Sequence, residues 1–250
     1  LVTADDTVAH LPGALRLGGD APLKEFEGLG ERMRDERGTA MPSAPTAVLK
    51  HLERYELSEH GVLRITLYDI RRVGGTTDVE QNAQAAGVRV DGDDTFRVLR
   101  RRILKRDGRI IEPNPTPNAS QAHADLSQLE AGDLVEAIYE NFSAADDTWN
   151  IGFDGPDLMP ERTAVIEAEI SLRYPKSVAI NLRSHALFGA AQERVDGNFV
   201  TKTFHLKDQT VRRIEFGTPR RDRAVSVTAT TRTWQDVGRA LSERASSLED

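Results

Sequence analysis

Cysteine is the residue type whose absence excludes most, since none occurs among the 250 residues of the chain. Disulfide bonds, thiolate metal sites and a cysteine nucleophile are therefore excluded from this stretch of sequence. The absence of cysteine does not fix the redox compartment, because such a protein is compatible with a reducing or an oxidising environment.

Long apolar runs are also missing. No segment approaches the roughly 20 apolar residues that a transmembrane helix needs, so we do not expect the chain to span a membrane by itself. No signal-peptide pattern follows the first residue, Leu1. The lack of an initiator methionine favours a mature protein or a piece of a longer one.

Positive charge is in the minority. The formal net charge is −7 and the sequence pI is near 5.5, which disfavours nucleic acid or an anionic membrane surface as a partner. Hydrophobic residues make up 38% of the chain and charged residues 29%, as in ordinary globular proteins. Aromatic residues are only 6%, so we expect most of them in the core.

The sequence lacks the common short signatures of enzymes. It has no Gly-x-Ser-x-Gly elbow, no His-Glu-x-x-His zinc helix and no phosphate-binding Gly-x-x-x-x-Gly-Lys loop. Its six histidines do not fall at a metal-ligand spacing. We therefore expect no catalytic residue, no metal site and no cofactor within the chain.

One basic stretch, from Arg97 to Arg109, runs against the overall negative charge. It could form a patch for anions or acidic polysaccharides. We favour the simpler interpretation that these side chains lie on the solvent face of a strand and its turn, with their aliphatic stems covering apolar surface.

Short segments with period-two alternation dominate the middle of the chain. The clearest hairpin joins residues 47–55 to 62–73, with Ser58-Glu59-His60-Gly61 as its turn. Further strands are expected at residues 95–105, 134–142, 163–174, 178–182, 211–216 and 224–230, and a hairpin at 191–206 turned by Asp196-Gly197-Asn198. Strands this short and numerous predict an all-β, mainly antiparallel β-sandwich over residues 47–232.

The two ends of the chain differ from the middle. Residues 1–46 are rich in glycine and proline and are expected to form an irregular, partly helical arm or the tail of an upstream module, with one short helix at 21–37. Thr233 can cap a helix over residues 233–250, which would lead toward a downstream domain.

Residues 106–140 repeat one pattern, in which a turn precedes each apolar segment. Arg106-Asp107-Gly108-Arg109 leads into Ile110-Ile111, and Glu130-Ala131-Gly132-Asp133 leads into the strand at 134–140. The segments DGRIIE, at 107–112, and ADLSQLEAGDLVEAIYE, at 124–140, resemble the domain of unknown function 3857 family. The resemblance extends from about Pro45 to the C-terminus, and residues 233–238 resemble the segment that leads into the next domain.

This resemblance implies a role for the chain but no catalytic site within it. Members of the family typically precede a transglutaminase-like domain, whose chemistry needs a cysteine thiolate activated by a histidine. Because the chain has no cysteine, the resemblance places no catalytic residue in it. It implies a non-catalytic accessory or positioning domain of a larger exported bacterial protein, in the periplasm or at the cell surface, with the adjacent domain, a protein or a glycan as partner.

A second hypothesis is a stand-alone carbohydrate-active enzyme or lectin that uses the loop from Glu112 to Asp125. In that loop His123 and Asp125 could act with Glu112, and Trp149, with Phe142 and Phe153, could stack on a sugar. The competing interpretation is a polar loop that satisfies its own backbone, and aromatic rings that fill the core.

Two further options come from the loops and the strands. Acidic residues in two loops offer oxygen ligands for calcium, although neither group has the spacing of an EF-hand and turn formation explains both: Asp91, Asp93 and Asp94, then Asp146, Asp147, Asp154 and Asp157. A strand such as 62–73 could also mediate self-association if it lay at the edge of a sheet.

Overall fold

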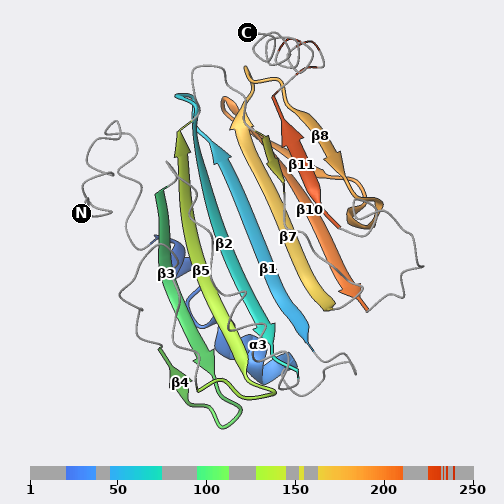
Figure 1. Cartoon of the computed structure of the whole chain (residues 1–250). Helices are drawn as coiled ribbons and strands as arrows, with labels where there is room; N and C mark the ends of the chain where they lie inside the picture. The colour runs from blue at the N-terminus through green and yellow to red at the C-terminus, as the bar shows by residue number, and fades with distance from the viewer. Residues whose placement is uncertain are drawn as a thin grey trace, which may run out of the picture.

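A computed structural model describes residues 21–37, 46–74, 95–112, 128–144, 152–154, 163–210 and 225–231, together with positions 233, 235 and 239. Most of these residues lie in β-strands, and the strands form one large sheet and one small sheet (Figure 1). The prediction of an all-β, mainly antiparallel domain is therefore confirmed.

The large sheet has eight strands in the order β4-β3-β5-β2-β1-β7-β10-β9. Its strands are β1 (Ala47–Leu57), β2 (Val62–Arg72), β3 (Thr95–Leu104), β4 (Ile110–Ile111), β5 (Leu134–Ala144), β7 (Ala164–Pro175), β9 (Gln192–Asp196) and β10 (Phe199–Gln209). β1 and β7 pair in parallel at the centre, and the other pairs of this sheet are antiparallel. The sheet is thus mixed, and the parallel pair is a feature that the sequence did not suggest.

The small sheet has the order β6-β11-β8, with β6 at Gly152–Asp154, β11 at Val227–Thr230 and β8 at Asn181–Ser184. A short 3-10 helix, η2 (Ala186–Phe188), follows β8. The sequence predicts no strand at 152–154 and places a strand at 178–182. The structure differs at both places, because pairing with β11 forms strands at 152–154 and 181–184.

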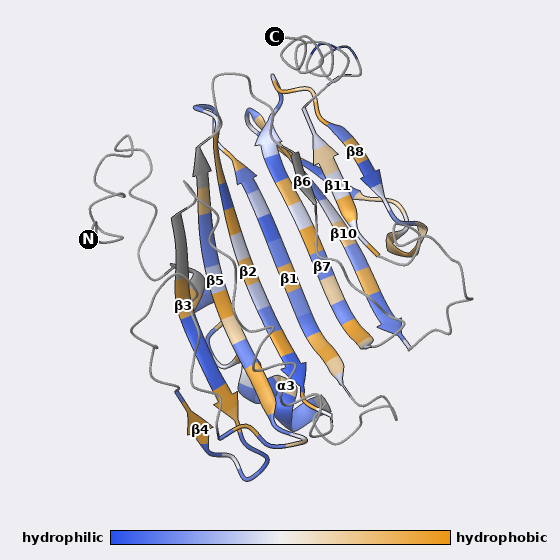
Figure 2. Ribbon diagram, in the orientation of Figure 1, coloured by the Kyte–Doolittle hydropathy of each residue, from blue (hydrophilic) through white to orange (hydrophobic). Residues whose placement is uncertain are grey.

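Hydrophobic and hydrophilic residues alternate along the strands of the large sheet (Figure 2). The buried apolar residues form two large cores and a small third one of Val73, Ile103 and Leu129. Neighbouring residues of a strand point to opposite faces, so Val48 enters one core while Ala47 and Leu49 enter the other. The first core joins β7 and β10 to the small sheet, and its buried members include Ile170, Leu172, Phe204, Leu206, Val227 and Ala229. In this half the two sheets pack as the predicted sandwich.

The second core lies under two N-terminal helices, α2 (Ala21–Glu25) and α3 (Leu29–Arg37). Phe26 and Met33 are buried against Tyr68, Ile70 and Ile138 of the large sheet, and the Phe26 and Tyr68 rings stack with their centroids 4.7 Å apart. A partly helical N-terminal arm is therefore confirmed. The rest of that arm, the predicted strand at 211–216 and nearly all of the predicted C-terminal helix lie outside the described residues.

Gly30 in α3 sits directly over the carboxylate of Glu136 in β5, and a methyl group at this position would overlap that carboxylate. Replacing glycine by alanine inside a helix ordinarily stabilises a protein by about 1 kcal/mol. We expect Gly30→Ala to lower the free energy of unfolding by about 1 to 3 kcal/mol instead, because of this overlap.

Urea denaturation followed by circular dichroism measures the effect. Glu36→Ala, at an exposed position of the same helix, is the control and should leave the midpoint nearly unchanged. A Gly30→Ala protein as stable as the wild type would show that α3 does not rest on Glu136.

Candidate functional site

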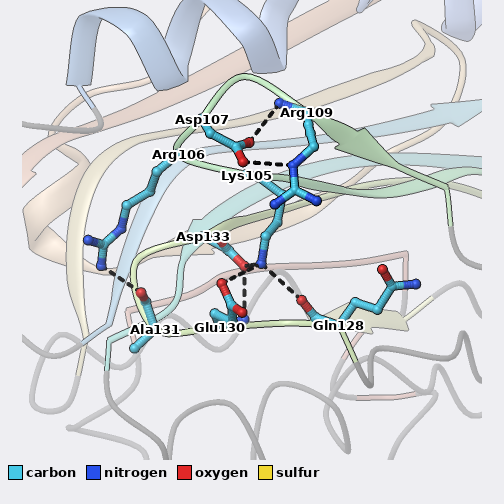
Figure 3. Close-up of polar contacts among 8 residues, drawn as sticks. All are labelled: Lys105, Arg106, Asp107, Arg109, Gln128, Glu130, Ala131 and Asp133. Carbon is cyan, nitrogen blue, oxygen red and sulfur yellow. Dashed lines mark hydrogen bonds and ion pairs between the residues drawn. The ribbon is translucent and has the colours of Figure 1, made fainter.

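Two turns that carry the 106–140 pattern lie against each other at one end of the large sheet (Figure 3). The first closes after β3, where Lys105 donates its N–H to the carbonyl of Arg109 at 2.9 Å and Gly108 takes a φ of +92°. The second precedes β5 and is tied to the end of β2, because the Gly132 N–H donates to the Val73 carbonyl at 2.7 Å and the Val73 N–H donates to the Asp133 carbonyl at 2.9 Å. We call residues 105–109 and 128–133 the turn pair.

The ammonium group of Lys105 joins the two turns. It donates to Asp133 Oδ2 at 2.6 Å, to Glu130 Oε2 at 2.8 Å and to the Gln128 carbonyl at 3.0 Å. An ammonium has three N–H groups, so all three donors are used. Asp133 also accepts the backbone N–H of Glu130 at 2.8 Å, which fixes the second turn around the same carboxylate.

This ion pair is buried, with the side chains of Lys105 and Asp133 only 6% and 3% exposed. Burial alone would lower the pKa of Lys105, but the hydrogen bonds to Asp133 and Glu130 outweigh it and raise that pKa above its ordinary value. Lys105 therefore stays charged and engaged, which suits a structural cross-link and not a nucleophile or a general base.

A shallow hollow of about 230 Å³ opens beside the turn pair. Three cationic and three anionic side chains line it together with Ala131: Lys105, Arg106 and Arg109, and Asp107, Glu130 and Asp133. Arg109 donates to Asp107 at 2.7 Å and Arg106 donates to the Ala131 carbonyl at 2.6 Å. The charges balance within the hollow, so its electrostatics favour neither an anion nor a cation.

The expectation that the basic stretch 97–109 faces solvent is wrong for three of its members. Arg101, Arg102 and Lys105 are 8%, 7% and 5% exposed. Arg102 pairs with Glu136 and with Glu31 of α3, the latter at 2.8 Å. The carboxylates that pair with Arg102 and Lys105 lie at least 25 residues away in the sequence, so no local pattern revealed them.

A second group of buried charges, which we call the His51 cluster, lies on β1 and β2. It is on the face of these strands that points away from the N-terminal helices. Asp69 stands directly across from His51 in the strand register, and the His51 Nδ1 lies 2.7 Å from Asp69 Oδ1. Arg71 donates to the other oxygen of Asp69 at 2.5 Å, and Glu53 Oε2 lies 3.9 Å from His51 Nε2. Sequence reasoning missed this cluster, because alternation in β1 is equally compatible with a solvent-facing row.

The cluster is charged at neutral pH. Burial would lower the pKa of His51, but the hydrogen bond to Asp69 and the nearby Glu53 raise it to about 9. Burial would raise the pKa of Asp69, but Arg71 and His51 lower it to about 2. A histidine that keeps its proton near pH 7 is a poor general base, so the cluster resembles a catalytic dyad in geometry but not in protonation.

Most of the site proposed from the loop lies outside the described residues, so it stays a prediction. Glu112 is exposed just beyond β4, while His123, Asp125 and Trp149 lie outside the described residues. Phe142 is 7% exposed and belongs to the core, as expected for most aromatic residues. Of the residues considered for calcium, only Asp154 is described, in β6.

Across the described part of the chain, no group of three or more histidine, aspartate or glutamate side chains could hold a metal ion. Among the same residues, no helix combines the length and apolar character that crossing a membrane requires. The candidate site features that the described residues offer are therefore the turn pair and the His51 cluster.

Removing the Lys105 charge should test the structural role of the turn pair. Lys105→Met leaves Asp133 buried without its cation, and we expect the free energy of unfolding to fall by about 3 to 5 kcal/mol. The double variant Lys105→Met/Asp133→Leu should recover a large part of that loss, because no unpaired charge remains. Glu130→Gln is the matched control and should have little effect, since the Glu130 side chain is 76% exposed.

Chemical denaturation of the wild type, Lys105→Met, Asp133→Leu, the double variant and Glu130→Gln measures these differences. Losses that simply add in the double variant would mean that Lys105 and Asp133 are not coupled.

The His51 cluster predicts a specific dependence of stability on pH. His51 has a pKa near 9 in the folded protein and about 6.5 when unfolded, so its contribution is complete below pH 6.5 and is lost as pH rises toward 9. The loss should reach about 3 kcal/mol across that window. Asp69, whose pKa is about 2, contributes above its ordinary value of 3.8 and loses its contribution as pH falls toward 2.

Urea denaturation at intervals between pH 6 and 9.5 gives the profile of the wild type, and His51→Gln should flatten it. Identical slopes in the two proteins would show that His51 does not titrate as the structure requires.

Comparison with solved structures finds a similarity of fold. No family model matches the sequence, and neither does any curated protein. Among solved structures, the chain is similar to one described as a putative protease from Parabacteroides distasonis ATCC 8503, with a TM-score of 0.63 and 14% sequence identity. The match covers 76% of this chain and 41% of the other, so this chain spans less than half the length of its structural neighbour. At this identity the likeness shows a shared fold.

Proposed function

We propose that this chain is a non-catalytic accessory domain of a larger exported bacterial protein, in which it binds and positions an adjacent transglutaminase-like domain. The observation that carries the proposal is the extent of the structural match. Three quarters of this chain corresponds to less than half of the neighbouring protein, so the same sheet occurs there as one part of a longer chain.

The residues that carry the family resemblance support a structural role. Lys105 of the turn pair is fully engaged by Asp133, Glu130 and a carbonyl, and Glu136 accepts hydrogen bonds from Tyr68 and Arg102. Groups that are buried and paired in this way hold strands and turns in place and do not present a reactive atom to a substrate. The turns and the strand at 106–140 therefore support a positioning role better than a catalytic one.

Acyl-transfer chemistry would then be performed outside this chain. A transglutaminase-like reaction needs a thiolate, and the 250 residues contain no cysteine. If the whole protein is a peptidase, as the name of the neighbouring structure says of that protein, its nucleophile belongs to the adjacent domain.

The gene on both sides of this segment provides the first test. We expect the reading frame to continue into a domain that contains a cysteine and a histidine. A reading frame without such a domain on either side would contradict the proposal.

The purified proteins provide the second test. The 250-residue chain should show no turnover of peptide or glutamine-donor substrates, whereas the longer product should show it and should lose it when the adjacent cysteine becomes alanine. Turnover by the isolated chain would contradict the accessory role, and saturable binding to glycans in calorimetry would favour the lectin alternative.

A further inference from the structure

The strand β9 forms one edge of the large sheet. It runs from Gln192 to Asp196, and all five of its residues are exposed. Within the described residues it pairs with β10 and with no other strand. The strand β2, which we had considered for self-association, lies between β1 and β5 and is not available, so that expectation was wrong.

The hairpin that precedes β10 determines which backbone groups of β9 face outward. Asp196 stands opposite Phe199 across a two-residue turn, and Gly197 supplies the positive φ of +55° at the first turn position. In such a hairpin the closing pair exchanges both backbone hydrogen bonds, and the next pair does not. The N–H and C=O groups of Val195 and Glu193 therefore point away from β10, toward solvent.

The side chains of β9 are complementary to a second copy of the same strand. Val195 is 55% exposed, the highest value among the exposed large apolar residues of the described chain. Arg194 and Asp196 flank it, and neither has an ion pair with another described residue. A twofold axis through Val195 generates the second copy of the strand. It places Arg194 opposite Asp196 of the second copy, and Asp196 opposite Arg194 of the second copy.

We propose that two copies of this chain associate through β9, in antiparallel register with Val195 opposite Val195 at a twofold axis. The outward backbone groups of the two valines bond to each other, the two side chains cover each other, and two Arg194–Asp196 ion pairs close the contact. The large sheets of both copies then form one continuous sheet.

The charges select this register over its neighbours. An axis at Arg194 would place two guanidinium groups opposite each other, and an axis at Glu193 would do the same with two carboxylates. Like charges directly across an antiparallel pair are destabilising, and opposite charges contribute roughly 0.2 to 1 kcal/mol each. Charged residues on an edge strand usually prevent association, and here they prevent it in every register considered except one.

The contact uses the same surface on both copies, so it closes at a dimer and leaves no free β9 edge. A single short strand pair buries a small area, and the dimer is accordingly weak. This inference is independent of the accessory role, because β9 lies at the opposite edge of the large sheet from β3 and β4, which the first turn of the turn pair connects.

Cross-linking tests the register directly, because the chain has no cysteine of its own. Directly opposed residues of a hydrogen-bonded antiparallel pair have Cα atoms about 5.5 Å apart, which suits a disulfide. Val195→Cys should therefore form a covalent dimer under mild oxidation. Glu193→Cys is the matched control, since the two positions 193 lie roughly 14 Å apart along the strands in this register.

Sedimentation equilibrium tests the charges. Arg194→Asp places two carboxylates opposite each other on both sides of the axis and should weaken dimerisation about tenfold, whereas Arg194→Asp/Asp196→Arg should restore it. Circular dichroism would confirm that each variant keeps its β-structure, as expected for exposed positions.

Disulfide formation at Val195 alone, together with loss and recovery of the dimer in the charge variants, would support the proposal. Equal cross-linking of the two cysteine variants would overturn it. So would a wild type that remains monomeric at every concentration, or a dimer that Arg194→Asp leaves unchanged.

Discussion

The half of the large sheet that contains β1, β2, β3 and β5 depends on buried charges that neighbouring side chains neutralise. Lys105 is held by Asp133, Arg102 by Glu136 and Glu31, and His51 by Asp69, and each of these contacts joins two different strands, turns or helices. Removing one member of such a pair leaves an uncompensated charge in a poorly solvated place, which costs far more than the pair contributes. The buried pairs therefore specify which strands and turns can lie together.

The same constraint explains how the N-terminal helices attach to the sheet. The Tyr68 hydroxyl donates to Glu136 at 3.0 Å, and burial and the Glu136 carboxylate raise the pKa of Tyr68 well above its ordinary range. Above this polar pair, the Phe26 ring stacks on Tyr68, and the Arg54 guanidinium lies 5.6 Å from the centre of the Phe26 ring. Gly30 allows α3 to approach the Glu136 carboxylate closely. An apolar contact and a polar one thus fix the helix at the same place.

Local sequence was sufficient for the features that depend on neighbouring residues. The β1–β2 hairpin and the β9–β10 hairpin follow from turn residues and periodicity, and the structure confirms them. The helix predicted at 21–37 is present as two short helices, α2 and α3. The parallel pairing of β1 with β7 could not be inferred in this way, because more than 100 residues of sequence separate them and alternation does not specify a partner. The prediction that the basic stretch 97–109 faces solvent failed for a related reason. A run of arginines is expected to be exposed unless the carboxylates that pair with it are known. Of the residues proposed for the loop site, only Glu112 is described, and it is exposed.

The coupling between Arg102 and Glu136 tests the central claim most directly, since this pair links β3 to β5 at the base of α3. A double-mutant cycle with Arg102→Met and Glu136→Leu, measured by urea denaturation at low and high salt, gives the coupling energy between the two side chains. The account predicts a coupling of about 2 kcal/mol that survives 1 M salt, because buried pairs are screened far less than exposed ones. A coupling near zero, or one that salt abolishes, would contradict it and would place these charges at the surface.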